Sequence, residues 1–547
     1  FVGKTADGTE SDILITLTFR DDSAYLTGRT VPPPNSADMF IYELDAVAWK
    51  KYGGGTGEPN DPYEIATAED LMLLGESPED YDKHFILTAD IDLDPNLPGR
   101  NVFDRAVIAP DLDPNDAYSM FQGTSFMGVF NGDGHKILHL TIEGESYLGL
   151  FGQLGSEARI FQMFLEAVDI KGAERNIGSL VGDSHGILSQ CYSTAVVSGE
   201  IAVGGLVGVN DGSVAKSYST GEVCGFYFVG GLVGDNWGSI TESHSTGAVS
   251  GRDDVGGLVG FSGGGDTGKV IACYSDSTVN GNWYVGGLVG SNYGSITESH
   301  STGIFTGDDK VGGLVGDNGV GGSITESYST GMVNGNMYVG GLVGSNRDTI
   351  TDCYSLADVE GEDYIGGVVG INGMVLGSEA LPHYDYGIIS NSYSAGLVVG
   401  THSAGGLVSY NAVGEITNSF WDIQTSGQVS SAGGTGKTTA EMQMVSTFLD
   451  AGWDFTGESV NGTEDIWSIC EGTNYSRLAW QIPAGDFVCP DGITIDDFLF
   501  FIEHWRDDNC DSSNDYCQGT DLDLSGTVDE DDLEIFLENW LADVRSD

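Results

Sequence analysis

The residues of this chain whose types and spacing could do chemistry lie near its C-terminal end, in the acidic segment 521–532. Oxygen donors stand there at positions 1, 3, 5, 7, 9 and 12 of a twelve-residue loop: Asp521, Asp523, Ser525, Thr527 (through its carbonyl), Asp529 and Asp532. Gly526 occupies position 6, where such a loop must turn sharply. Because hard oxygen ligands in this number select Ca²⁺, the segment predicts a calcium site, with Ca²⁺ as the cofactor.

Helices must hold this loop, and their pattern indicates a duplication. Residues 533–541 place apolar side chains on one face of a helix that follows the loop. Residues 496–505 form a second predicted helix with a similar Glu-x-Trp ending. We therefore expect a small α-helical calcium-binding domain made of two loop–helix halves.

The loop of the first half is degraded. When it is aligned on Gly492, Phe487 and Cys489 stand where the second loop has Asp521 and Asp523, and the first loop is one residue short. Four acidic residues remain as candidate ligands for a weakly held ion: Asp486, Asp491, Asp496 and Asp497. Occupancy of this first loop stays open.

The middle of the chain is a repeat that must support this domain. The hexapeptide Val-Gly-Gly-Leu-Val-Gly, or a close variant, begins at Ile177, Val203, Val229, Val255, Val285, Val311, Val339, Ile365 and Ala404. One unit, residues 285–307, contains three short β-type runs bounded by Gly, Asn or Ser, which tolerate tight turns and positive φ. A period of about 26 residues with three such runs is typical of a parallel β-helix. We expect a mainly β protein, a parallel β-helix (β-solenoid) of about ten coils with capping segments.

Stacked coils place equivalent residues above one another, which predicts two ladders. The aromatic ladder comprises Tyr192, Tyr218, His244, Tyr274, His300, Tyr328, Tyr354, Tyr393 and Phe420. The Asn ladder comprises Asn210, Asn236, Asn292, Asn318, Asn346 and Asn372, with Ser262 interrupting it. Stacked Asn amides are expected to hydrogen-bond from coil to coil. The aromatic ladder could instead be a sugar-binding strip.

The eight cysteines fall into groups. Cys191, Cys273 and Cys353 share one slot of the repeat and are expected to be buried small hydrophobes, and Cys224 is left over. Four cluster near the C-terminus, namely Cys470, Cys489, Cys510 and Cys517. Two disulfides in an oxidising compartment are expected from them, with the pairing open.

The composition excludes some partners. The chain has 82 acidic against 21 basic residues and a formal charge of −61, which argues against nucleic acid and anionic membranes. It has no apolar run of about 18 residues, so membrane insertion is not expected. It begins with Phe-Val-Gly instead of Met, which is typical of a processed, secreted protein. We therefore expect an extracellular or cell-surface location.

Both ends of such a rod expose strand edges, so covers are expected. The segments 67–70 and 438–441 have the pattern of capping boxes, and they predict helices over 68–75 and 439–449. Before the first cover, residues 13–19 alternate like a strand and residues 38–49 form a second strand-like run. These strands either pack onto the cap or pair with a neighbouring subunit.

The pattern Gly-Gly-Leu-Val-Gly-x-Asn followed by Ser-x-Thr-Gly-x-Val-x-Gly resembles the GLUG-repeat family of bacterial secreted or cell-surface proteins. The likeness is greatest to large secreted proteins of Planctomycetes. Residues 53–71 and 126–135 resemble the module that precedes the repeats in this family, and 420–442 the module that follows them. The resemblance spans about residues 53–481 and implies a β-helix with adhesive or scaffolding use.

The two loop–helix halves, residues 486–541, resemble a type I dockerin, which implies calcium-dependent docking to a cohesin-like partner. Glu530 and Asp531 stand where dockerins often carry Ser or Thr for partner recognition. The predicted domains are 1–50 (N-terminal β-strand segment), 51–142 (cap with one short helix), 143–420 (GLUG-repeat β-helix), 421–484 (exit/cap module) and 485–547 (dockerin-like calcium-binding domain).

Recurring acids in the repeat bear on whether the chain is an enzyme. Glu242, Glu298 and Glu326 occur in register, as a ladder position does and a unique catalytic group does not. We predict no catalytic residue and a secreted, non-enzymatic scaffold of the cell surface, the matrix or a self-assembled fibre. Its partner would be another protein or a second copy, bound through the C-terminal domain, with the N-terminal strands as a second candidate contact. The alternatives are a carbohydrate-binding adhesin anchored to a cohesin-like partner and a polysaccharide-degrading β-helix enzyme.

Overall fold

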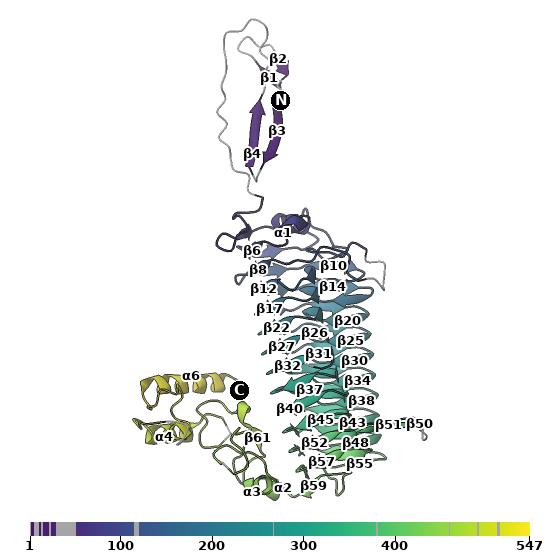
Figure 1. The fold of residues 1–547 in the computed structure, drawn as a ribbon, viewed down its shortest axis with the longest axis vertical. Coiled ribbons are helices and arrows are strands. Elements are labelled where there is room, and N and C mark those ends of the chain that lie inside the picture. Colours follow the sequence, from purple (N-terminus) through teal and green to yellow (C-terminus); the bar gives the residue numbers. More distant parts are fainter. Residues whose placement is uncertain are drawn as a thin grey trace.

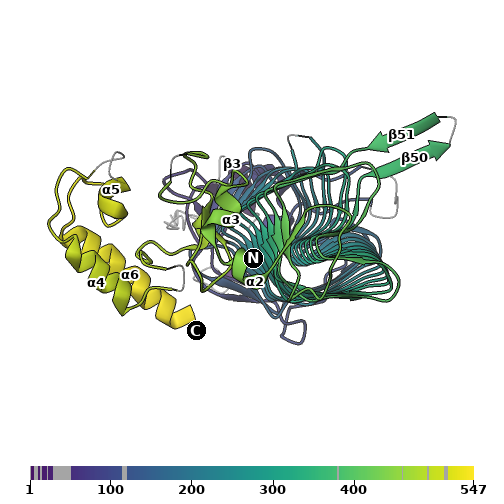
Figure 2. The same ribbon diagram turned by 90° about the horizontal axis from the view of Figure 1, so that it is seen from below.

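The chain forms a long parallel β-helix with a small helical domain beside it (Figure 1). The computed structural model describes residues 2–4, 10–12, 15–20, 23–28, 51–113, 120–265, 267–378, 381–458, 460–489, 492–510 and 515–546. Viewed along the rod, successive coils superimpose, and the hairpin of β50 (Met374–Ser378) and β51 (Leu381–Asp385) projects from the side opposite the helical domain (Figure 2).

The number of coils agrees with the repeat count. The nine hexapeptides begin in a parallel sheet of nine strands, from β15 (Arg175–Ile177) to β55 (Ala404–Gly405). They end in a parallel sheet of ten strands, from β11 (Phe151–Leu154) to β56 (Val408–Asn411). A third sheet has 13 strands, from β5 (Tyr63–Ile65) to β57 (Glu415–Thr417). Its additional strands come from the cap segment, which therefore adds to the rod's own sheet and shares its apolar core.

Each coil has more strands than the three that the sequence predicts. The unit at residues 283–306 contains β34 (Trp283–Gly286), β35 (Val289–Asn292), β36 (Ser295–Thr297) and β37 (His300–Thr306). The predicted run 295–301 is split because Glu298 takes a left-handed conformation with φ of 49° and turns the chain. Glu242, two coils before it, and Glu326, one coil after it, have the same conformation, so the recurring acid marks a corner.

The repeated glycines serve close packing, and this differs from the expected role in positive-φ turns. A Cβ atom on Gly286 would lie 1.9 Å from the carbonyl oxygen of Val289, and one on Gly290 would lie 2.5 Å from that of Gly260. Backbone therefore packs directly on backbone where β34 folds back onto β35. The left-handed corners of the same coil fall on Tyr284 (φ of 55°) and Glu298.

Both ladders are present. Rings from Phe164 to Tyr393 stack in register, with centroids 4.5 to 5.2 Å apart. Phe164 is a rung that the repeat count missed, and Phe420 lies in register with Tyr393 while its ring packs on Phe448. The Asn318 amide donates to the Asn346 side-chain oxygen at 2.8 Å and accepts from Asn292 at 2.9 Å. The same bond links the other Asn neighbours, and Asn372 continues it to Asn411.

The two predicted covers differ. Helix α1 (Ala68–Gly75) has the predicted bounds and capping box, and it buries Leu71 and Leu74 at one end of the rod (Figure 1). The predicted helix 439–449 is two short helices, α2 (Thr439–Met442) and α3 (Val445–Leu449), because the chain breaks at residues 443–444. The Thr438–Glu441 capping box is present.

Beyond these helices the exit module turns back along the aromatic ladder. Three indole N–H groups hold it to the rod: Trp453 donates to the Asn418 carbonyl oxygen (2.8 Å), Trp467 to Asp352 Oδ1 (3.2 Å) and Trp480 to the Glu326 carbonyl oxygen (3.0 Å). All three acceptors are left-handed corner residues of different coils. The module thus covers the ladder from His300 to Phe420, whereas Tyr274 remains 36% exposed.

The terminal regions complete the chain. Strands β1 (Val2–Lys4) and β2 (Glu10–Asp12) pair antiparallel, as do β3 (Ile15–Arg20) and β4 (Ser23–Gly28), beyond the α1 end of the rod (Figure 1). The predicted strand 13–19 corresponds to β3, and the strand-like run 38–49 lies outside the described residues. In the C-terminal part of the chain, α4 (Ile495–Glu503), α5 (Asp515–Gln518) and α6 (Glu530–Ser546) form the helical domain, which lies beside the rod (Figure 1).

Candidate calcium-binding loop and its degraded copy

The predicted loop 521–532 follows α5 and ends in the first turn of α6, and it brings three of its six predicted ligands together. Ligand oxygens of Asp521, Asp523 and Asp532 lie within 4.8 Å of one another. Asp521 and Asp532 are buried at 1% and 0% exposure, and Gly526 turns the loop with φ of 96°. Two buried carboxylates and a third beside them make a strongly anionic concavity with the hard oxygen donors that Ca²⁺ prefers.

Backbone N–H groups aim these carboxylates. Asp532 Oδ1 accepts from the amides of Leu522 (2.6 Å) and Asp523 (3.0 Å), and its Oδ2 accepts from that of Asp529 (2.8 Å). Asp521 accepts from the amides of Ser525 (3.0 Å) and Gly526 (2.9 Å). A carboxylate has about four lone-pair sites, so both side chains keep capacity for a cation.

The other three predicted ligands bond to one another beside this cluster. Ser525 Oγ donates to the Thr527 carbonyl oxygen at 3.1 Å, so positions 5 and 7 are adjacent. Thr527 Oγ1 donates to Asp529 Oδ2 at 3.3 Å. A cation could replace the Ser525 hydroxyl as the partner of the Thr527 carbonyl. The residues present therefore fit Ca²⁺, and Asp529 is not among the three clustered carboxylates.

The electrostatics of the cluster depend on burial. Burial raises the pKa of Asp521, and the charge of Asp532 adds to this, while the amides of Gly526 and Ser525 oppose it. Hydrogen bonds from Ser525 lower the pKa of Asp523. The charged form is therefore favoured at Asp523 and disfavoured at Asp521. A bound cation would stabilise the charged form of Asp521.

The degraded copy has the same backbone scaffold. Asp497 Oδ1 accepts from the amides of Phe487 (2.7 Å) and Val488 (2.9 Å), and its Oδ2 accepts from that of Thr494 (2.8 Å). These three bonds repeat those of Asp532, each displaced by 35 residues. Asp486 also accepts from the amide of Gly492, as Asp521 does from that of Gly526.

This displacement corrects the alignment based on Gly492. The first loop runs from Asp486 to Asp497 and has twelve residues, so it is not one residue short. Asp486 and Asp497 stand at positions 1 and 12, but positions 3 and 5 hold Val488 and Pro490. Asp491, another candidate ligand, lies outside the described residues. The copy keeps the carboxylates at its two ends and lacks the side-chain oxygen donors at positions 3 and 5.

Apolar contacts and disulfides hold the two halves. The rings of Phe501 and Phe536, also 35 residues apart, stack at 5.3 Å. Cys510 pairs with Cys517 inside the domain, and Cys489 pairs with Cys470 of the exit module. The repeat cysteines Cys191, Cys273 and Cys353 are buried and free, as predicted, and burial raises the pKa of their thiols.

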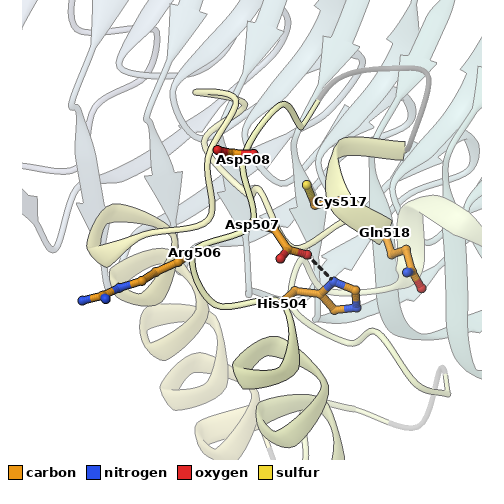
Figure 3. Close-up of a pocket in the computed structure, with 6 residues that line it drawn as sticks. All are labelled: His504, Arg506, Asp507, Asp508, Cys517 and Gln518. Atoms are coloured by element: carbon orange, nitrogen blue, oxygen red, sulfur yellow. Dashed lines mark hydrogen bonds and ion pairs between the residues drawn. The ribbon is translucent and has the colours of Figure 1, made fainter.

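A shallow hollow lies beside the second disulfide (Figure 3). Its lining is polar and comprises His504, Arg506, Asp507, Asp508, Cys517 and Gln518. His504 Nδ1 lies 2.9 Å from Asp507 Oδ2, the interaction drawn in the figure. The hollow is open and has a carboxylate–imidazole pair, with Cys517 committed to a disulfide.

Comparison with known proteins identifies the repeat. Residues 281–306 and 335–360 match the family model described as "The GLUG motif". The chain carries the GLUG motif. Both matches lie in coils whose hexapeptide and ladder residues are described above. Separately, within the described residues no helix is long and apolar enough to cross a membrane.

Relatives match only parts of the chain. Halomucin of Haloquadratum walsbyi is 29% identical over 196 residues, which are 35% of this chain and 2% of halomucin. A "Putative Gly-rich membrane protein" of Evansella cellulosilytica is 33% identical over 150 residues, which are 25% of this chain and 15% of that protein. The chain thus spans a small fraction of the length of these relatives.

One solved structure was also found to be similar. A crystal structure of a "putative immunoglobulin A1 protease" from Bacteroides ovatus covers 79% of this chain and 96% of its own, with 17% identity and a TM-score of 0.27. A likeness of this degree carries no conclusion about the fold or activity of the present chain.

Proposed function

We propose that this protein is a secreted, non-enzymatic scaffold of the cell surface, the matrix or an extracellular fibre, and that its C-terminal domain docks in a calcium-dependent way. The carboxylate cluster of Asp521, Asp523 and Asp532, in the helical domain beside the GLUG rod, carries the proposal. In this proposal the β-helix acts as a spacer, and the calcium loop controls attachment to the partner. The docked partner is a protein of the cohesin type or a second copy of the chain.

Three observations support a place outside the cell. Two disulfides are typical of an oxidising compartment. The charge of −61 keeps such a rod soluble and separate from other copies until a cation is bound. One relative is named as a membrane protein, and another as halomucin. The resemblance of residues 486–541 to a dockerin agrees with the duplicated loop scaffold.

Calcium titration of the full chain tests the docking domain. We expect one Ca²⁺ per chain by isothermal titration calorimetry, and loss of that heat in Asp521→Asn and Asp523→Asn. Asp531→Asn is the matched control, because Asp531 is exposed and stands at position 11, which supplies no ligand. Equal calcium binding by Asp521→Asn and the wild type would contradict the proposal.

Assembly is measured on the same variants. Sedimentation and electron micrographs with Ca²⁺ and with a chelator show whether the chain associates with itself. Calcium-dependent polymers that Asp521→Asn cannot form would identify a second copy as the partner. Release of reducing sugars from plant or bacterial polysaccharides by the purified chain would overturn the non-enzymatic part.

A second candidate function is carbohydrate binding, at a site other than the aromatic ladder that the sequence suggested as a sugar-binding strip. In the ladder, ring faces are stacked on each other, so few are free for a sugar. An exposed cluster elsewhere on the rod has Phe226 (43% exposed) and Trp283 (39%) around the Arg252 guanidinium, which lies 5.3 and 4.9 Å from their ring centroids. A glycan array compares the wild type with Trp283→Ala, and saturable binding lost in the variant would favour this candidate.

A further inference from the structure

One group of side chains on the rod breaks the repeat. Asp183 is a buried residue of β16 (Val181–Ser184), His185 follows that strand, and Asp211 follows β21 (Val207–Asn210) on the next coil. The positions that stack on His185 hold different residue types, including Asp211 and Trp237, whereas the neighbouring ladder repeats Asn. A position that departs from a stacked column is where a site specific to one coil can lie.

The three side chains converge. One ligand atom of each of Asp183, His185 and Asp211 lies within 4.8 Å of those of the other two. His185 Nε2 is 3.6 Å from Asp183 Oδ1, and His185 Nδ1 is 3.2 Å from Asp211 Oδ2. The imidazole therefore lies between two carboxylates that come from successive coils.

Asp183 is held in place from behind. Its Oδ2 accepts a hydrogen bond from Gln153 Nε2 at 2.9 Å, and the Gln153 Oε1 accepts one from Ser125 Oγ at 2.6 Å. Asp183 itself is 7% exposed, and its Oδ1 is fully buried without a hydrogen-bond donor. A buried carboxylate oxygen that faces only an imidazole lacks the compensation that buried charge requires.

A further buried carboxyl group lies in the same column. Asp235 stands in the same column as Asp183, two coils along, and its Oδ1 is also buried without a hydrogen-bond donor. Burial raises the pKa of Asp235 to about 7, and the charges of Asp211 and Asp183 add to that. Among the described residues, no Lys or Arg forms an ion pair with Asp183, Asp211 or Asp235. The His185 imidazole can carry one positive charge when it is protonated, and a bound metal cation would take the place of that proton.

We propose that Asp183, His185 and Asp211 bind a divalent transition-metal ion of the Zn²⁺ type on the side of the rod. An imidazole nitrogen with two carboxylate oxygens suits Zn²⁺ and its neighbours, whereas Ca²⁺ takes oxygen ligands alone. Metal–ligand bonds of about 2.0–2.2 Å require the three ligand atoms to come closer together, and one imidazole nitrogen to face both carboxylates, whereas Nε2 now faces Asp183 and Nδ1 faces Asp211. The side chains of His185 and Asp211 are 41% and 37% exposed, so they can rotate to supply this.

The same exposure leaves the metal's outer positions open. Three protein ligands are one fewer than a closed tetrahedral site has, so water or a group from another molecule completes the coordination. This site is independent of the C-terminal loop, because it lies on the early GLUG coils and has a nitrogen donor. A rod with such a site would respond to Zn²⁺ in the presence of saturating Ca²⁺.

The experiment titrates Zn²⁺, and Co²⁺ as a coloured substitute, into the full chain with Ca²⁺ in excess to fill the C-terminal loop. We expect one equivalent to bind with visible Co²⁺ absorption, and His185→Gln and Asp211→Asn each to weaken binding at least tenfold. Both residues are exposed, so the variants should melt at the wild-type temperature, which a thermal scan checks.

The control variant is His139→Gln. His139 also faces a carboxylate, with Nδ1 3.0 Å from Asp92 Oδ1, but its side chain is 49% exposed and it has one acidic partner instead of two. It should bind Zn²⁺ as the wild type does. No bound equivalent in the wild type, or equal affinity in His185→Gln and the wild type, would overturn the proposal.

Discussion

The rod and the C-terminal domain are both built by repetition, but they use it differently. In the rod, copies of a residue contact one another: the rings of Tyr328 and Tyr354 stack at 4.9 Å and 2°. In the C-terminal domain, the two copies share a backbone scaffold at a spacing of 35 residues, and only the second keeps the donors between its terminal carboxylates.

The difference concerns what constrains each position. A residue of a ladder must suit the rung above and the rung below, so a change in one coil disturbs three coils. A ligand residue of the second loop is constrained by the proposed calcium ion. The first loop lacks side-chain donors at positions 3 and 5, and Asp497 still accepts its backbone hydrogen bonds. Variants can test separately the contact between neighbouring rungs of a ladder and the binding of an ion by the loop.

The largest effect is expected from Asn318→Ala. Asn318 is fully buried and bonds to the Asn292 and Asn346 side chains and to the Gly322 carbonyl oxygen. Its loss leaves buried partners unsatisfied and should lower the free energy of unfolding by about 3–5 kcal/mol. Thermal unfolding measures this against Asn336→Ala, which removes an exposed bond to Asp308. Similar melting temperatures for the two variants would break the account of the ladder.

The two loops should respond differently to calcium. Ca²⁺ at a hundredfold excess over its Kd should stabilise the C-terminal domain by about 2.7 kcal/mol, and Asp532→Asn should abolish this gain. Asp497→Asn should destabilise the domain by about 1–3 kcal/mol whether or not Ca²⁺ is present, because it weakens only the backbone bonds. Calorimetric scans with and without chelator measure both. If Asp497→Asn alone removed the calcium gain, the first loop would hold the ion.

A pH effect of about 2 kcal/mol is expected in the aromatic ladder. Burial lowers the pKa of His300 to about 4, so the folded state binds fewer protons than the unfolded state. Stability is complete above about pH 6.5 and is lost as the pH falls toward 4. His300→Tyr, which copies the neighbouring rungs, should flatten the unfolding free energy between pH 7 and pH 5. An unchanged pH profile would show that the rung is hydrated.

The smallest effect, about 1–2 kcal/mol, is expected from Asp254→Asn. Burial raises the pKa of Asp254 to about 6, so its stability contribution is complete below about pH 3.9 and is lost as the pH rises through 6. Asn suits the left-handed conformation at this position and keeps an acceptor for the Ser291 hydroxyl. The variant should be more stable than the wild type at pH 8 and equal to it at pH 4, by denaturant titration.

Recurrence explains how much the sequence could predict. The β-helix, its coil number, both ladders and α1 followed from residues such as Asn318 and Tyr328, because stacking makes equivalent residues neighbours. The corner at Glu298 could not be predicted, since Glu carries no signal for positive φ and the cause is the packing of the coil. The exit module's return along the ladder depends on three Trp contacts between distant parts of the chain.

The remaining errors come from single residues. Gly492 served as the anchor of the first loop, but the hydrogen bonds of Asp497 place the glycine one position later than in the second loop. The disulfide pairing needs the fold, because four cysteines allow three connectivities. The group around His185 was missed because it does not recur. A site that occurs once in a repeat is visible only after the coils are stacked.

The disulfide between Cys470 and Cys489 fixes how force travels through the molecule. The two cysteines are 19 residues apart in sequence, and the bond makes the connecting segment a closed loop. A pulling force on α4 or α6 therefore enters the exit module at Cys470, and the segment between the two cysteines cannot extend. From there the load spreads through Trp453, Trp467 and Trp480 over several coils at once. While this disulfide is intact, we expect a pulling force to reach the exit module without extension of the segment 470–489. After reduction of the disulfide, that segment can extend first.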